Sequence, residues 1–223
     1  MTATASPPLA PTRDSWHRVA EHVLAAGQYA AAGTIRLRPS PGGFRTTVGV
    51  DGRQLAVVGD RLVVTDGGGD RSTSLTTLRA AAAFAGVTPG LSGSYAPATS
   101  ADPDAPLTID ADAAEVLAAW FALGDAALRR FSEGIGRPQE PVLWPEHFDV
   151  GIALDAVNYG VSPGDDAIPD PYLYVGPHEG PPSADAYWNA PFGAAITADR
   201  IRTTDDAVAF FEQGRALTDR SGQ

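Results

Sequence analysis

The stretch PGGFRTTVGVD, residues 41–51, is matched without gaps by PEHFDVGIALD, residues 145–155. Each has a proline, a phenylalanine three positions later, and a strand pattern that ends in aspartate. Further along, TTLRAAAAFAG at 76–86 matches TTDDAVAFFEQG at 203–214 in position and type. Because self-similarity along a chain indicates a repeated structural unit, the matches predict an internal duplication with pseudo-twofold symmetry. Chance similarity in an alanine-rich chain is the alternative.

The residues around the first stretch predict a helix, an antiparallel meander and a second helix. Ser15 is expected to cap the first helix, and Gly33 to end it. The second helix is expected to run from about Ser74 to Gly86. The β-branched runs between these helices are separated by Asp-Gly and Gly-Asp turns, which favours hairpins; they are 34–38, 44–50, 53–59 and 61–66.

The second stretch is preceded by the strongest helical pattern in the chain. Asp112 and Glu115 have the spacing of a capping box, and a wide apolar stripe follows them. We therefore expect an α+β fold made of two helix, antiparallel-sheet and helix halves. The expected organisation is a disordered tail at 1–14, a first half at 15–87, a Pro/Ser/Ala-rich linker at 88–111, a second half at 112–218 with a long insertion at 156–195, and a tail at 219–223.

Composition excludes several kinds of chemistry. The 223-residue chain has no cysteine, and all 16 of its basic residues are arginine, so thiol chemistry and lysine Schiff bases are ruled out. A formal charge of -11 argues against nucleic acid and anionic membrane surfaces as partners. The N-terminus has no secretory signal pattern, and a cytoplasmic location is expected.

The charge is concentrated in residues 138–199, which contain ten carboxylates, eight aromatic residues and two histidines but no arginine. We call this the acidic-aromatic segment. Carboxylates that converge without balancing cations repel one another, so a fold that gathers them recruits a cation, a cationic partner or protons. The segment is therefore the predicted functional region.

Within this segment, strand alternation would place His147 and Asp149 on one face. Together they could be metal ligands, or a catalytic base and the carboxylate that orients it. If the strand before His178 lies beside that of His147, then His178 and Glu179 could complete a divalent metal site. The alternative is that these histidines bond to backbone carbonyls or lie in exposed loops.

Aromatic and amide side chains of the same segment could line a pocket for a cationic or amphipathic small molecule. The expected ligand-binding residues are Trp144, Glu146, Asn158, Tyr159, Tyr172, Tyr174, Trp188 and Asn189. The alternative is that the aromatic rings form a small core of their own. Asp165, Asp166 and Asp170 could bind calcium or magnesium, but a Ser-Pro-Gly-Asp turn is favoured there.

The N-terminal helix contains HRVAEH at 17–22, which has one residue more than the spacing of a zinc motif. Only His17 and Glu21 share a face at i and i+4. The sequence therefore favours a surface helix here, with His22 nearer its apolar side.

The motifs IRLRPSPGGF, LTTLRAAAAFAG, LWPEHFD, NYGVSPGD, PYLYVGP and WNAPFGAA resemble a set of uncharacterised actinobacterial proteins. The resemblance implies a shared fold and no activity. The leading hypothesis is a soluble small-molecule- or metal-binding protein, with catalysis left open. The alternatives are an interaction module whose acidic-aromatic segment binds a basic protein, and a structural homodimer.

Overall fold

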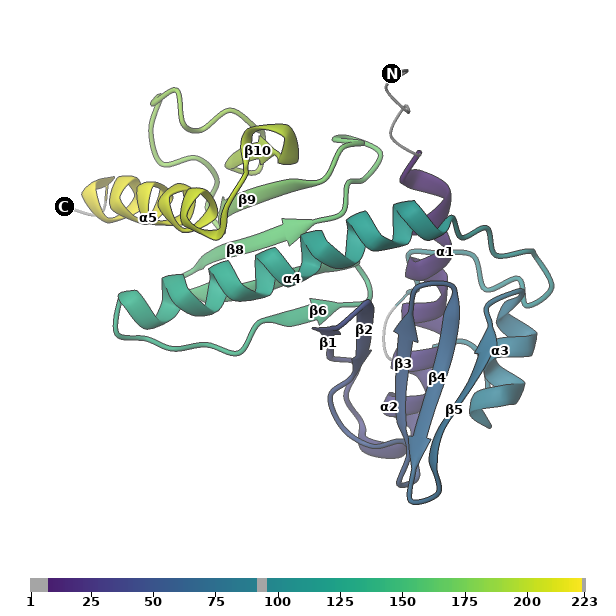
Figure 1. The fold of residues 1–223 in the computed structure, drawn as a ribbon. Coiled ribbons are helices and arrows are strands. Elements are labelled where there is room, and N and C mark those ends of the chain that lie inside the picture. The colour runs from purple at the N-terminus through teal and green to yellow at the C-terminus, as the bar shows by residue number, and fades with distance from the viewer. Residues whose placement is uncertain (1–7, 92–95, 222–223) are drawn as a thin grey trace. The chain divides into compact units, whose positions relative to one another are not determined.

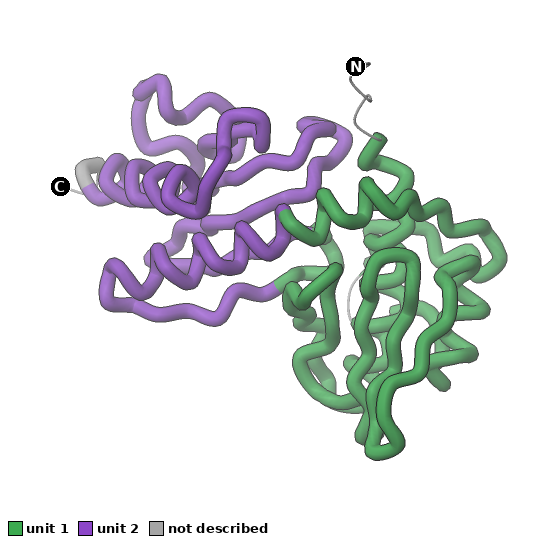
Figure 2. The backbone as a smooth tube through the Cα atoms, viewed as in Figure 1, with its two compact units in different colours: residues 1–119, 143–148 green, residues 120–142, 149–223 purple. Residues whose placement is uncertain are grey.

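The computed structural model describes residues 8–91 and 96–221. The chain divides into two compact units, coloured separately in Figure 2. Unit 1 comprises residues 1–119 and 143–148, and unit 2 comprises residues 120–142 and 149–223. Each unit combines helices with an antiparallel sheet, which confirms the predicted α+β class.

The first helical region of unit 1 is longer than predicted. It consists of α1 (Ala10–Val19), the π-helical turn η1 (Ala20–Ala25) and α2 (Ala26–Ala32). Gly33 ends it in a left-handed conformation with φ 69°, as predicted. The prediction that Ser15 caps the helix is wrong. Ser15 is a buried interior residue whose hydroxyl donates to the carbonyl of Thr108 at 3.0 Å, so this serine serves tertiary packing.

Five antiparallel strands follow in a meander, in the order in which they occur in the chain. They are β1 (Leu37–Ser40), β2 (Gly43–Thr46), β3 (Gln54–Val58), β4 (Arg61–Asp66) and β5 (Gly69–Ser74). Side chains such as Leu37, Phe44 and Leu55 are fully buried on the inner face. In Figure 1, α1, α2 and α3 (Leu78–Ala85) lie behind β3, β4 and β5, on one side of this sheet.

The helix α3 begins later than the sequence suggested, because Ser74 ends strand β5. Its cap is Thr77, whose hydroxyl accepts from the N–H of Ala80 at 3.1 Å. It ends at Gly86, as predicted, in a left-handed conformation with φ 67°.

Residues 96–110 contain no helix and no named strand, in keeping with their irregular sequence, but they belong to unit 1. The carboxylate of Glu21 accepts from the N–H of Ala98 at 2.8 Å and of Thr99 at 2.9 Å. Further on, the N–H of Asp110 donates to the hydroxyl of Thr12 at 2.9 Å. These bonds attach the segment to the N-terminal helices of unit 1, whereas the sequence predicted a linker between two halves.

The long helix α4 (Ala111–Gly134) confirms the strongest helix prediction, although its cap differs. The carboxylate of Asp110, two residues before the predicted cap, accepts from the N–H of Ala113 at 2.9 Å. The helix contributes to unit 1 up to residue 119 and to unit 2 from Trp120 onwards.

Unit 2 contains a second antiparallel meander. Strand β6 (Val142–Trp144) belongs to unit 1 from Leu143 onwards, and Leu143 pairs there with Leu37. The strands of unit 2 are β7 (Asp149–Leu154), β8 (Val157–Ser162), β9 (Tyr172–Pro177) and β10 (Ala194–Thr197). The short helix η2 (Ala198–Arg200) leads to α5 (Thr204–Ser221). On the inner face, Tyr159 packs between Phe131 of α4 and Phe211 of α5, with ring centroids 4.7 and 6.1 Å away.

The element order of helix, five strands and helix thus occurs twice. The two matched sequence stretches also turn in the same way. Asp51 and Gly52 form the turn between β2 and β3, with φ 50° and 79°. Asp155 and Ala156 form the turn between β7 and β8, with φ 51° and 62°. Positive φ at both central residues is typical of type I′ turns, so the aligned aspartates have the same local role. A common origin of the halves stays a prediction.

Within the part of the chain that the structure describes, no helix is both long and apolar enough to cross a bilayer.

Candidate functional site

A pocket of about 500 Å³ in unit 1 contains two of the predicted ligand-binding residues, Trp144 and Glu146. Its other lining residues, which include Tyr29 and Arg36, come from α2 and the approach to β1. We call this the Trp144 pocket. It brings an aromatic face, a cation and a carboxylate to one hollow, which is the mixture of groups that orients a small ligand.

Two features of the Trp144 pocket concern charge. The guanidinium of Arg36 lies over the indole of Trp144, 5.6 Å from the ring centroid, in a cation-π contact. The Oε2 atom of Glu146 is buried and has no hydrogen-bond partner among the described residues. A buried polar atom without a partner is rare and costly, so this oxygen calls for a donor.

The turn that carries Glu146 is held by tertiary contacts. Phe148 has φ 52°, and its N–H donates to the carbonyl of Trp144 at 2.7 Å. Its ring stacks on His17 at 5.1 Å, and Nε2 of His17 lies 2.7 Å from the carbonyl of Pro145. Burial lowers the pKa of His17, with an opposing contribution from Glu21. The neutral ring can therefore donate to Pro145 and fix the turn.

The structure does not place His147 and Asp149 on one strand face. Residues 145–148 form a turn, and β7 begins only at Asp149, so the alternation assumed for this stretch does not apply. His147 is exposed and belongs to unit 1, whereas Asp149 is buried and belongs to unit 2. The left-handed residue Phe148 between them is the physical reason.

The predicted metal ligands are not gathered either. Strand β9 pairs with β8, and β8 pairs with β7, so the strand before His178 is not the neighbour of β7. Nε2 of His178 lies 3.3 Å from the side-chain oxygen of Asn158, and both residues are exposed, as is Glu179. Over residues 8–91 and 96–221, no group of three or more His, Asp or Glu side chains could hold a metal ion. A metal site stays a prediction that this finding does not support.

Tyr172 and Tyr174 do lie on one face of the sheet in unit 2, with ring centroids 6.3 Å apart. Each hydroxyl donates to a carboxylate, Tyr172 to Asp165 at 2.6 Å and Tyr174 to Asp149. Burial, and then the charge of Asp149, raise the pKa of Tyr174 well above its usual value. The tyrosine therefore stays protonated and serves as a donor to Asp149.

The remaining predicted residues lie elsewhere in unit 2. Tyr159 is 1% exposed in the core, and its pKa is raised to about 12, chiefly by burial. Trp188 packs edge-on against Tyr187 at 4.9 Å. The side-chain NH₂ of Asn189 donates to the carbonyl of Ala195, and its side-chain oxygen accepts from the N–H of Ala195, both at 2.9 Å. These residues stabilise the long insertion and do not share a pocket with Trp144.

Sequence reasoning missed a buried polar cluster on η1. Glu21 and His22 are both fully buried, which corrects the prediction of a surface helix. The carboxylate of Glu21 accepts from the hydroxyl of Thr99 at 2.6 Å as well as from two backbone N–H groups. Nε2 of His22 lies 3.0 Å from the same hydroxyl. The cluster attaches residues 98 and 99 to the helix, and Nδ1 of His22 is buried without a hydrogen-bond partner among the described residues.

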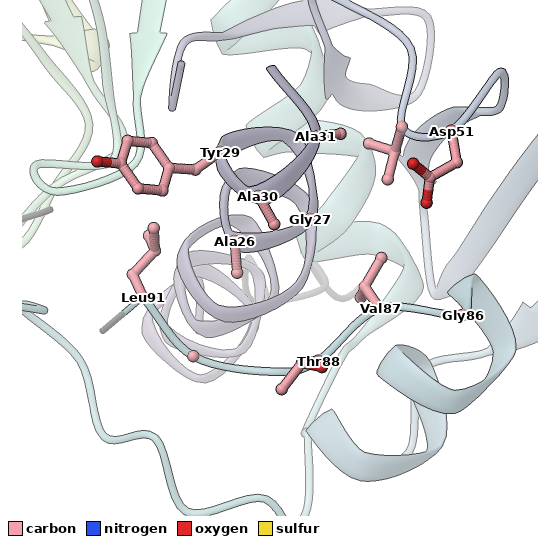
Figure 3. Close-up of a pocket in the computed structure, with 12 residues that line it drawn as sticks. Ala26, Gly27, Tyr29, Ala30, Ala31, Asp51, Gly86, Val87, Thr88 and Leu91 are labelled. Atoms are coloured by element: carbon pink, nitrogen blue, oxygen red, sulfur yellow. The ribbon is translucent and has the colours of Figure 1, made fainter. Parts of the chain in front are cut away.

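A second pocket of unit 1, of about 400 Å³, lies on another side of α2. Figure 3 shows its walls: alanines and Gly27 of α2, Val87, Thr88 and Leu91 after α3, and Asp51. The only charged side chain in this lining is Asp51, whose carboxylate already accepts from Arg53 at 3.3 Å. Tyr29 lines both pockets. With few groups that could orient a ligand, this pocket is the weaker candidate.

No family model, curated protein or solved structure matches the chain. The functional argument therefore depends on the geometry of the pockets.

Proposed function

We propose that unit 1 binds a small zwitterionic molecule, of the kind of a free amino acid, in the Trp144 pocket. The observation that carries the proposal is that Glu146 and Arg36, whose side chains have no ion-pair partner among the described residues, line the same pocket. A ligand with an amine and a carboxylate would satisfy both groups at once.

The amine belongs at Glu146. An ammonium group donates up to three hydrogen bonds, and a bond between an ammonium and a carboxylate is stronger than one between neutral groups. The carboxylate of Glu146 has no ion-pair partner among the described residues, so an ammonium group would not have to displace one.

The carboxylate belongs at Arg36. Its guanidinium has no carboxylate partner among the described residues, and it is positioned by stacking on Trp144. A planar guanidinium held in this way presents parallel N–H groups, which suit a carboxylate. Because Arg36 covers Trp144, we assign the anionic end of the ligand to this side of the pocket. The sequence suggested a cationic or amphipathic ligand, and the position of Arg36 adds an anionic group to that description.

The test is calorimetry with each of the common L-amino acids as the titrant, and with ethylamine and acetate as single-charge comparators. We expect binding by at least one amino acid and weaker binding by both comparators. Glu146→Gln and Arg36→Gln should each weaken it about tenfold or more, which corresponds to one lost charge-assisted hydrogen bond.

The matched control is Glu115→Gln, which makes the same chemical change at an exposed position of unit 1 and should leave the affinity unchanged. The proposal fails if no amino acid binds below about 10 mM, the range that a few good hydrogen bonds should reach. It also fails if ethylamine or acetate binds as tightly as the amino acid.

A further inference from the structure

The outer face of the sheet in unit 1 carries two arginines directly opposite each other. Arg38 of β1 and Arg45 of β2 are cross-strand partners, and Arg45 is in turn opposite Ala56 of β3. Their neighbours Leu37 and Phe44 are fully buried on the inner face, so alternation places both arginines on the face away from the helices. Both side chains are partly exposed.

Neither arginine is neutralised by a carboxylate in the described part of the chain. Arg45 donates to the neutral side chain of Gln54 at 2.9 Å, and the side chain of Arg38 has no hydrogen-bond or ion-pair partner among the residues that the structure describes. Elsewhere arginines pair with aspartates, for example Arg79 with Asp104 at 2.6 Å. With no carboxylate bound to either, both guanidinium groups keep N–H donors for a ligand.

Such a pair costs stability when nothing lies between the guanidinium groups. Directly opposed residues on neighbouring antiparallel strands have Cβ atoms about 5 Å apart, and like charges in these positions repel each other. An anion between two guanidinium groups converts that repulsion into attraction, because each planar fork can donate parallel N–H bonds to oxygen atoms.

We infer that Arg38 and Arg45 form a binding site for the phosphate or carboxylate group of a small anionic molecule. The bond from Arg45 to Gln54 positions one guanidinium, since Gln54 is itself held by donating to the carbonyl of Thr46 at 2.6 Å. The residue opposite Arg45 on β3 is Ala56, whose side chain is small. The site shares no residue with the Trp144 pocket, so the two proposals can fail separately.

The experiment measures the melting temperature of the full chain against increasing inorganic phosphate, with succinate as the carboxylate probe. Sodium chloride at equal ionic strength is the reference. We expect phosphate, succinate or both to raise the melting temperature of the wild type well beyond the chloride reference, because a ligand that binds only the folded state stabilises it. The probe with the larger effect identifies the preferred group.

Arg38→Gln and Arg45→Gln should each abolish most of this shift, and calorimetry should show binding weakened about tenfold or more. The control is Arg61→Gln on the same face, where the guanidinium bonds to the hydroxyl of Ser72 at 3.0 Å and has no opposing arginine. This variant should respond like the wild type. Equal shifts in phosphate, succinate and chloride would overturn the inference, and so would an equal loss in Arg61→Gln.

Discussion

Trp16 and Trp120 make the same hydrogen bond in the two units. The indole N–H of Trp16 donates to the carbonyl of Gly59 at 3.0 Å, directly after β3. The indole N–H of Trp120 donates to the carbonyl of Ser162 at 2.8 Å, at the end of β8. In each unit, one tryptophan thus joins a helix to the sheet.

The spacing of these tryptophans agrees with the sequence match. The same number of positions separates Trp16 from Trp120, Phe44 from Phe148, and Asp51 from Asp155. The match that begins at Pro41 and Pro145 therefore extends without a gap back to the tryptophans in the preceding helices. This correspondence favours the predicted duplication over chance.

We expect Trp16→Phe and Trp120→Phe to destabilise the protein by about 1 to 3 kcal/mol each, because each leaves a backbone carbonyl without its donor. Trp120→Phe should cost more, since its bond to Ser162 is buried whereas that of Trp16 is partly buried. Urea denaturation measures both values. An unchanged free energy of unfolding in both variants would show that these hydrogen bonds do not contribute to stability.

The ring of Tyr174 lies across two glycines, and this predicts a steric effect. A Cβ atom at Gly160 would be 2.3 Å from Cζ of Tyr174, a distance that real Cβ atoms do not reach. Gly160→Ala should therefore displace the ring, disrupt its bond to Asp149 and destabilise the protein by about 1 to 3 kcal/mol. Thermal unfolding of the variant checks this.

The control for this prediction is Gly176→Ala on the neighbouring strand. The nearest atom to its added Cβ would be the carbonyl oxygen of Phe192 at 3.6 Å, an ordinary contact. Its melting temperature should stay within the small range expected of a tolerated substitution. If both variants melt alike, the close packing of Tyr174 on Gly160 is not what limits this position.

The buried carboxylate of Glu21 is expected to matter for folding. Glu21→Gln replaces one oxygen by an NH₂ group, so either the N–H of Ala98 or that of Thr99 loses its acceptor, since each bonds to a different oxygen. We expect a loss of about 2 to 4 kcal/mol, as for other buried groups left without a partner. Exposed Glu133→Gln should change stability by less than about 0.5 kcal/mol. Equal effects in denaturant titrations would contradict a special role for Glu21.

Helix ends were more predictable from sequence than helix starts. Gly33 and Gly86 end their helices in left-handed conformations. This conformation favours glycine whatever the tertiary contacts, so the local sequence is enough to predict it. Ser15 was the predicted cap of the first helix and Ser74 the predicted start of the second, but Ser15 lies inside a helix and Ser74 ends a strand. Their hydroxyl groups can bond to distant partners as well as to a local N–H, so local sequence could not decide between these roles.

The sequence predicted two of the residues that line the candidate site but not Arg36 and Tyr29. Trp144 and Glu146 were identified from composition, and they do share a pocket. Arg36 and Tyr29 come from the first half of the chain and could be added only through the pairing of β1 with β6. The alternation in IRLR does place Arg36 and Arg38 on the face opposite Leu37, and this signal could have been used. The positive φ of Phe148, which separates His147 from Asp149, has no signal in the sequence.

Burial of His17 predicts a loss of stability in mild acid. Its folded-state pKa is below the ordinary value of 6.5, mainly because burial disfavours the charged ring. As the pH falls through 6.5, the unfolded chain therefore binds a proton that the folded chain resists, so stability is complete above this pH and decreases below it. The slope from this group cannot exceed about 1.4 kcal/mol per pH unit.

His17→Gln should reduce the difference in unfolding free energy between pH 7 and pH 5, measured by urea titration. His178→Gln, at an exposed position, should leave that difference as in the wild type. A pH dependence unaffected by His17→Gln would mean that other groups cause the acid sensitivity and that the ring stacked on Phe148 can be protonated without cost.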